Sequence, residues 1–307
     1  MKSLQITIHL LGSRICCFIN NEKSFQIKDI VHDYGLSTMT EQLMIIAALV
    51  PAAALLYFVF RRDRLNREPF KALIKAFGWG CLSVPISLTI SFPLQWLGLY
   101  PAEATNLFGA ISISFFGAAI PEEIAKLVVL WLCLRKNKYF NEHMDGIVYA
   151  ACVALGFAAV ENIMYVVGNE ESWIHVAFSR AIYAVPGHFL DGVLMGYFLS
   201  LAIFSPYRRK LHMALVLVAP IVAHGIYDSI LFSMDTIENV WIIGILTQLF
   251  YGFCFLLWFF GIRLMNKHLQ RDRLRMEAEQ AAAASSEVAD EVVIAESASE
   301  PNVEVEQ

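Results

Sequence analysis

The sequence predicts an all-α, polytopic helical membrane protein with about seven transmembrane helices. Hydrophobic residues make up 57% of its 307 residues, whereas a soluble domain is roughly 45–50% apolar. They occur in continuous blocks as long as the ~20 residues that a helix needs to cross a bilayer core. Because the blocks do not alternate between apolar and polar residues, a transmembrane β-barrel is excluded.

Seven blocks are the expected spans, and the segments between them differ in charge. The segments after the first, third, fifth and seventh spans are rich in Lys and Arg, as in RRDRLNREPFK and RKNK, whereas the other three contain neither. Basic loops remain on the cytoplasmic side of a membrane. The N-terminus is therefore expected outside and the C-terminus in the cytoplasm. The spans cover about residues 42–60, 72–98, 107–134, 146–167, 179–203, 212–233 and 240–262.

The chain divides into three parts. Residues 1–41 form an extracytoplasmic segment, in which Met39 directly precedes the first span and is an alternative start of translation. Residues 42–262 form the membrane domain. In residues 263–307 the last span is expected to extend as a cytoplasmic helix to about Met276. The acidic tail that follows has no aromatic residue and cannot bury enough apolar surface to offset the entropy of ordering, so we expect it to be disordered.

Charge and cysteine content exclude several classes of protein. The net charge of −5 arises from the tail, because residues 1–276 hold 23 basic and 19 acidic side chains and so carry +4. No basic stripe is interleaved with aromatic residues, so we expect no binding to nucleic acid. The six cysteines show no CxxC or Cys/His spacing, which excludes a disulfide framework and a cysteine-based zinc site.

Ionisable and amide side chains are concentrated on four consecutive spans, the third to the sixth. A charged side chain at the centre of a transmembrane helix costs about 2.5–3.5 kcal/mol on insertion scales. The interiors of the first, second and seventh spans contain essentially none. The concentration of ionisable and amide side chains on four spans predicts one polar chamber inside the bundle. Its residues are Glu122, Glu123, Lys126, Glu161, Asn162, His188, Asp191, His224 and Asp228.

The spacing of these residues predicts pairs on common helix faces. Glu122 and Lys126 are four residues apart, as are His224 and Asp228, so each pair lies on one face. The first pair can neutralise itself, and Asp228 can fix the tautomer of His224. Glu123 points about 100° away from Glu122 and is therefore expected to be free for other work.

Prolines precede three of these groups, and each removes a backbone donor and can kink its helix. Pro121 can occupy the first turn of a half-helix and place both glutamates near its positive end. The prolines are Pro121, Pro186 and Pro220.

Buried glutamates and histidines favour hydrolase chemistry without a serine or cysteine nucleophile. A glutamate in a low-dielectric site holds its proton more tightly and can act as a general base on water. Histidines can donate to an oxyanion or pass a proton to a leaving amine. The same groups could bind a divalent metal such as zinc, although no HExxH motif is present. Two other classes stay open: a proton-coupled transporter, which also uses intramembrane acids and histidines, and a non-catalytic receptor or scaffold.

The ordered set of motifs resembles the PrsW family of intramembrane proteases, which is related to the type II CAAX-processing and bacteriocin-processing membrane proteases. The resemblance covers about residues 42–262 and leaves out both ends of the chain. The matching pieces are RRDRLNREPF (61–70), PEEIAK (121–126), GFAAVENIMY (156–165), PGHFLDGVLMGY (186–197) and AHGIYDSIL (223–231).

The resemblance implies a peptidase that cuts a membrane-anchored protein such as an anti-sigma factor, in a bacterial cytoplasmic membrane. The implied catalytic residues are Glu122, Glu123, His188 and His224, with Asp228 as a partner where the related proteases carry an Asn-type residue. Supporting or substrate-binding roles fall to Lys126, Glu161 and Asn162. Which glutamate is the base stays open, and so does the choice between water activated by glutamate alone and a zinc ion bound by the two glutamates and two histidines. His143 and Asp145 are expected to be solvated in a cytoplasmic loop, and no role is assigned to His268.

Overall fold

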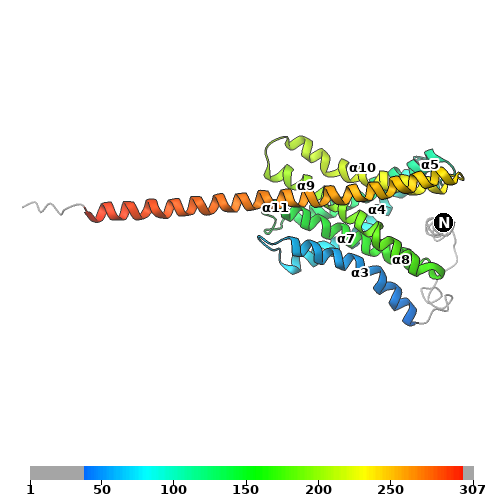
Figure 1. Ribbon diagram of the computed structural model, residues 1–307, viewed down its shortest axis with the longest axis horizontal. Coiled ribbons are helices and arrows are strands. Elements are labelled where there is room, and N and C mark those ends of the chain that lie inside the picture. Colours follow the sequence, from blue (N-terminus) through cyan, green and yellow to red (C-terminus); the bar gives the residue numbers. More distant parts are fainter. Residues whose placement is uncertain (1–37, 300–307) are drawn as a thin grey trace, which may run out of the picture.

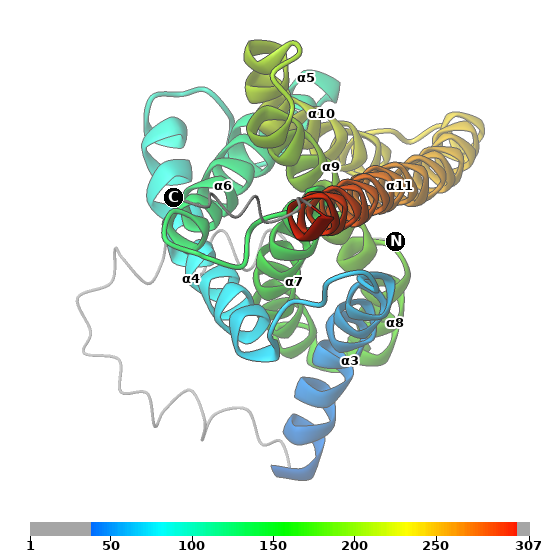
Figure 2. The same ribbon diagram turned by 90° about the vertical axis from the view of Figure 1, so that its left-hand side faces the viewer.

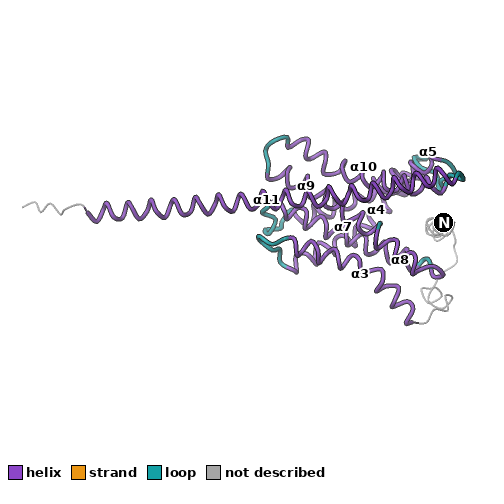
Figure 3. The backbone as a smooth tube through the Cα atoms, in the orientation of Figure 1, coloured by secondary structure: helices purple, strands orange, loops and turns teal. Residues whose placement is uncertain are grey.

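The computed structural model describes residues 38–299, with side chains from residue 40 to residue 286, so the predictions for residues 1–37 lie outside it. Over this range the chain is helical and contains no strand (Figure 3). Six segments are long and apolar enough to cross a membrane. This confirms the predicted all-α, polytopic fold. The six segments comprise α3 (Thr38–Arg62), α4 (Phe70–Trp96), α7 (His143–Val167), the unit of η2 (Glu170–Ser172), α8 (Trp173–Ile182) and α9 (Ala184–Phe204), then α10 (Arg209–Asp235) and α11 (Val240–Ser299).

The predicted third span differs from a regular transmembrane helix. It consists of α5 (Leu107–Ser112), the π-helix η1 (Ile113–Ala119) and α6 (Ile120–Leu134), which follow one another without a loop. The seven predicted spans therefore correspond to these six segments and to this irregular one. A π-helix inside a helix is rare and is found mostly at functional sites.

The last helix, α11, continues far beyond the bundle as a single rod (Figure 1). The prediction that the helix ends near Met276 and that the acidic tail is disordered is wrong up to Ser299. The tail needs no buried surface to be helical, because the Ala, Glu and Gln residues that are frequent in it are strong helix formers. Two ion pairs between side chains four residues apart add to the helix, Arg273–Glu277 and Arg275–Glu279, both at 2.8 Å.

Helix α7 is the centre of the bundle, and α3, α4 and α9 surround it (Figure 2). In the apolar stretch of α7 that would cross the membrane, 78% of the residues are buried. Small residues let the neighbouring backbones approach closely: a Cβ atom added at Gly196 of α9 would lie 2.2 Å from the carbonyl oxygen of Gly146 in α7. A Cβ atom added at Gly156 of α7 would lie 2.1 Å from the carbonyl oxygen of Phe77 in α4. Close packing of small residues is the usual means of holding membrane helices together.

The four basic segments gather at one end of the bundle, which we call the basic end. Asp272 of α11 accepts hydrogen bonds from the backbone N–H groups of His143 and Met144 at 2.9 and 2.8 Å. Asn66, in the segment after α3, donates a hydrogen bond to Asn141 at 3.3 Å. The segment between α9 and α10 forms a hollow with His143 and Arg271. The charge pattern of the sequence thus correctly predicted which segments lie together at this end of the bundle.

Replacing Gly196 by Ala should lower the free energy of unfolding by about 1–3 kcal/mol, because backbone atoms of α7 fill the space that the new methyl group needs. The measurement is reversible unfolding of the purified protein in mixed micelles. The matched control is Gly252→Ala in α11, where nothing lies within 4 Å of an added Cβ atom. Equal stability of the two variants would contradict close packing of α7 on α9.

Candidate active site

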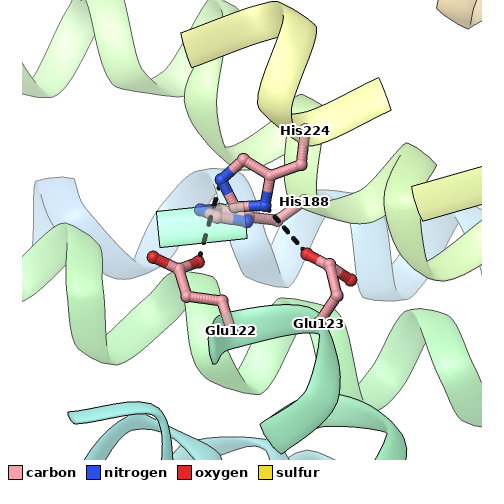
Figure 4. Close-up of side chains that lie close together, drawn as sticks. All are labelled: Glu122, Glu123, His188 and His224. Atoms are coloured by element: carbon pink, nitrogen blue, oxygen red, sulfur yellow. Dashed lines mark hydrogen bonds and ion pairs between the residues drawn. The ribbon is translucent and has the colours of Figure 1, made fainter. Parts of the chain in front are cut away.

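Side chains from three helices meet inside the bundle (Figure 4). Glu122 and Glu123 come from α6, His188 from α9 and His224 from α10, and one donor atom of each lies within 4.8 Å of the others. Three of the four are buried, and Glu122 is the most exposed of them, at 15% of its side chain. The polar chamber that the sequence predicts is therefore present.

The π-helix leads directly into the two glutamates. Pro121 and both glutamates occupy the first turn of α6, as predicted. The turn is not a free helix end, however, because the backbone N–H of Ile120 donates to the carbonyl oxygen of Phe115 in η1. The predicted positive end of a half-helix is therefore not formed. The ring of Phe115 fills the space beside Gly225, where a Cβ atom would lie 2.4 Å away, and so α10 can bring His224 close to α6.

Lys126 lies in the middle of the cluster and is only 1% exposed. Its Nζ atom donates to Glu123 Oε1 at 2.7 Å and is 3.5 Å from Glu122 Oε2. It also lies 3.1 Å from His188 Nδ1 and over the ring of Phe157. The sequence predicted Glu122 as the partner of this lysine and Glu123 as the free glutamate. The predicted pair with Glu122 is present at the longer distance. The prediction that Glu123 is free is wrong, because a residue three positions away shares the helix face equally well and Glu123 forms the shorter ion pair.

His224 is held by carboxylates on both of its ring nitrogens. Nδ1 is 2.9 Å from Glu123 Oε1, and Nε2 is 3.3 Å from Asp228 Oδ2 and 3.9 Å from Glu122 Oε2. The predicted pair of His224 and Asp228 is therefore confirmed. Asp191, to which the sequence gave no role, is also buried and lies 3.9 Å from His224 Nδ1.

His188 is bound on the other side of the chamber by Glu161 of α7. Its Nε2 atom lies 2.7 Å from Glu161 Oε2, and since a carboxylate only accepts, Nε2 carries the proton. The same oxygen accepts from Arg180 of α8 at 2.8 Å. Asn162 does not face the chamber: it donates to the carbonyl oxygen of Ala48 in α3 and accepts from Arg180. Sequence reasoning missed Arg180, although an arginine just inside a predicted span is itself a signal.

A cavity of about 190 Å³ opens beside the chamber. It reaches Asn169 and Asp235, which lie at the ends of α7 and α10 farthest from the basic end. Glu123 and Lys126 do not line it. Apolar and aromatic side chains form most of its wall, and the charged and imidazole side chains that line it are Glu122, Glu161, Arg180, His188, His224, Asp228 and Asp235.

The four donors at the centre fit a zinc-type metal in their chemistry, because imidazole nitrogen and carboxylate oxygen are both ligands of that ion. Glu123 Oε2 is buried and has no hydrogen-bond partner among the described residues, which a cation would provide. The ammonium group of Lys126 already contacts three of the four residues. A metal could therefore occupy the site only if the side chain of Lys126 moved.

A second group of buried polar residues lies at the basic end. Asp145 is fully buried and accepts hydrogen bonds from the N–H groups of Asn141 and Glu142, both at 2.8 Å. His143 Nδ1 is 2.9 Å from Asp272. The prediction that His143 and Asp145 are solvated is therefore wrong, because Asp272 of α11 pairs with His143 and Asp145 is buried where it caps the start of α7. His268 is also buried, and its ring stacks on that of Tyr197 in α9.

Burial shifts the ionisation of three carboxyl groups outside the spans at this end. It raises the pKa of Asp63 to about 6 and the pKa values of Glu68 and Glu142 to about 8. Glu68 in addition accepts a hydrogen bond from the hydroxyl of Tyr149. We therefore expect the stability of this end of the bundle to depend on pH.

Comparisons with known proteins agree with the resemblance seen in the motifs. A sequence model described as PrsW family intramembrane metalloprotease matches residues 68–261. Protease PrsW of Bacillus subtilis is 34% identical over 73% of this chain and 94% of its own length. Protease PrsW of Oceanobacillus iheyensis is 34% identical over 60% and 81%, and that of Clostridioides difficile is 28% identical over 75% and 93%. No solved structure matches the chain.

Replacing Lys126 by Met should lower the free energy of unfolding by about 3–5 kcal/mol, because Glu123 loses the ammonium group that faces it inside the bundle. The double variant Glu123→Gln/Lys126→Met should lose less, since no unpaired charge stays buried. Unfolding in mixed micelles measures both, and the exposed Lys136→Met is the control. If the double variant lost as much stability as Lys126→Met and Glu123→Gln lose separately in sum, the pair would not be coupled.

Raising the pH should destabilise the basic end. An unfolded glutamate has a pKa of about 4.3, whereas that of Glu68 is about 8 in the folded protein. Between these values the folded protein keeps a proton that the unfolded chain releases, so the free energy of unfolding falls as the pH rises. Melting temperatures across this range should fall less steeply in Glu68→Gln than in the wild type. The exposed Glu277→Gln is the control, and an unchanged slope in Glu68→Gln would refute the assignment.

Proposed function

Because the chain belongs to the PrsW family of intramembrane metalloproteases and is a multi-pass membrane peptidase, we propose that it hydrolyses a peptide bond of a membrane-anchored protein in the chamber beside Glu122. The observation that carries the proposal is the cavity on which Glu122, His188 and His224 converge. Family membership does not favour the transporter alternative.

Glu122 is the general base of the proposed reaction. It lines the cavity, is 15% exposed, and has only long contacts, at 3.5 Å with Lys126 and 3.9 Å with His224. Glu123 does not line the cavity, and one of its oxygens accepts from both Lys126 and His224. A base must reach the water that it activates and must be free to take its proton. Glu122 meets both conditions, while Glu123 holds the lysine and the histidine in place.

His224 is the proposed electrophilic partner. Carboxylates lie near both of its ring nitrogens, at 2.9 Å from Nδ1 and 3.3 Å from Nε2, and this arrangement favours the doubly protonated ring. A protonated imidazole facing the cavity can donate to the oxyanion of the tetrahedral intermediate or to the leaving amine. His188 lies against it, with the ring centres 5.3 Å apart, and its Nε2 proton is committed to Glu161. In this role His188 shapes the chamber.

A metal can be included in the same site. With Lys126 moved aside, Glu122, Glu123, His188 and His224 would hold zinc, which when bound polarises a carbonyl oxygen and makes a bound water more acidic. The protein's own residues would then orient the substrate and exclude bulk water. Zinc is the proposed ion because imidazole and carboxylate ligands together suit it.

The proposed orientation places the basic end in the cytoplasm of a bacterial cell. The cavity then opens towards the opposite, extracytoplasmic half of the membrane, because it reaches Asn169 and Asp235. A substrate with a single transmembrane helix and an extracytoplasmic region, such as an anti-sigma factor, would present its scissile bond on that side. Cleavage there would be the first step of a regulated cascade.

The test is a cleavage assay in reconstituted membranes with a panel of tagged single-span bacterial proteins that includes anti-sigma factors. Glu122→Gln should lower the rate by about 10²–10⁴, the usual contribution of a general base. His224→Ala should be similarly impaired, and Asp228→Asn should lose about 10–100-fold, as expected for a residue that orients another. Full activity of Glu122→Gln would refute the assignment of the base.

Two controls accompany the assay. Glu238→Gln changes an exposed glutamate in the loop before α11, outside the cavity, and should cleave like the wild type. A chelator added to the wild type, followed by zinc, separates the two mechanisms: a loss that zinc restores supports a bound metal, and an unchanged rate supports glutamate alone.

A further inference from the structure

Arg180 is the one Lys or Arg side chain among the described residues that line the cavity. It lies in the last turn of α8, and its side chain is 12% exposed. Two edges of its guanidinium group are occupied: Nε donates to Asn162 Oδ1 at 2.7 Å, and Nη2 donates to Glu161 Oε2 at 2.8 Å. The group also lies over the ring of Tyr165, 3.9 Å from its centre. Its position is therefore fixed from three sides.

The oxygen that Arg180 binds is the one that binds His188. Glu161 Oε2 lies 2.7 Å from His188 Nε2 and 2.8 Å from Arg180 Nη2. The carboxylate of Glu161 is 19% exposed, so without the arginine it could turn towards the water in the cavity. With the arginine present, the carboxylate keeps the Nε2 proton of His188, and the Nδ1 atom is left as an acceptor towards Lys126.

The hydrogen bonds that hold Arg180 in place extend across the bundle. Asn162, which accepts from Arg180 Nε, is fully buried and donates to the carbonyl oxygen of Ala48 in α3 at 2.7 Å. The hydrogen bonds therefore run from the backbone of α3 through α7 and α8 to His188 on α9. The helix is interrupted at Tyr183, between α8 and α9, so α9 alone does not fix the ring of His188 relative to α8.

We propose that Arg180 is a positioning residue of the protease: it holds Glu161 in place, and Glu161 in turn fixes the orientation and tautomer of His188 in the chamber. The inference rests on the proposed function for its effect on cleavage, but the effect on His188 itself does not depend on it. Arginine is needed because its planar fork bonds to two acceptors at once, whereas a lysine ammonium cannot reproduce both bonds in this geometry.

The kinetic test compares Arg180→Gln, Glu161→Gln and the double variant in the cleavage assay. Each single variant should lower kcat by about 10–100-fold, the usual effect of losing a group that orients a functional histidine, and should leave KM unchanged. The double variant should be no slower than the slower single variant, since both changes break one linkage. Arg180→Lys should recover part of kcat. Arg135→Gln removes an arginine that also lies over an aromatic ring, that of Trp131, at the other end of the bundle, and should have no effect.

The proposal would be overturned if the losses of kcat in the two single variants multiplied in the double variant. A rise in KM with unchanged kcat would also overturn it. Either result would mean that Arg180 acts on the substrate directly. If Arg180→Gln does not fold, Arg180→Lys takes its place in the comparison with Glu161→Gln and the double variant, because lysine keeps the positive charge and one bond to Glu161.

A second measurement needs no substrate. Diethylpyrocarbonate modifies accessible, unprotonated imidazole nitrogens, and mass spectrometry can follow His188 and His224 in the same purified sample. Arg180→Gln should raise the reactivity of His188 several-fold and leave that of His224 unchanged, with Arg180→Lys in between. Unchanged reactivity of His188 would overturn the proposal. If His188 responds but the wild type cleaves no substrate, the positioning role stands and the proposed function fails.

Discussion

Two neighbouring glutamates can be buried inside this helical bundle because the ammonium group of Lys126 lies among their oxygens, 2.7 Å from Glu123 and 3.5 Å from Glu122. The unequal distances matter. The close pair neutralises Glu123 and, through the same oxygen, draws in His224 from α10, whereas the longer contact leaves Glu122 facing the cavity. One buried cation thus holds the helices of the chamber together and leaves one of the two carboxylates available for chemistry.

The backbone around this cluster is built for close approach. The π-helix before Pro121 turns Phe115 onto Gly225, next to His224. Glycines on α7 and α9 bring their backbones nearly into contact, which places Glu161 against His188. In a membrane, where lipid is as apolar as the helices, such packing supplies the association that the hydrophobic effect supplies in water. The polar cluster is therefore surrounded by closely packed helices.

The two ends of the bundle are specialised differently. The cavity extends from the chamber towards Asn169 and Asp235. At the basic end, Asp272 of α11 binds the first turn of α7, where its carboxylate accepts N–H groups that a helix leaves without partners. The long projecting helix is thus fastened to the central helix that carries Glu161.

The sequence by itself determined the helical membrane fold, the end at which each loop lies and the spans that carry the chamber, because all of these depend on local hydrophobicity, charge and periodicity. It also identified the pair of His224 and Asp228, which lie one turn apart. Only the tertiary structure decided which glutamate Lys126 binds more closely, that Arg180 completes the site, and that His143 is bound by Asp272, 129 residues later in the chain. The physical reason is that spacing fixes which residues share a helix face, whereas burial and partners across the bundle depend on how the faces meet.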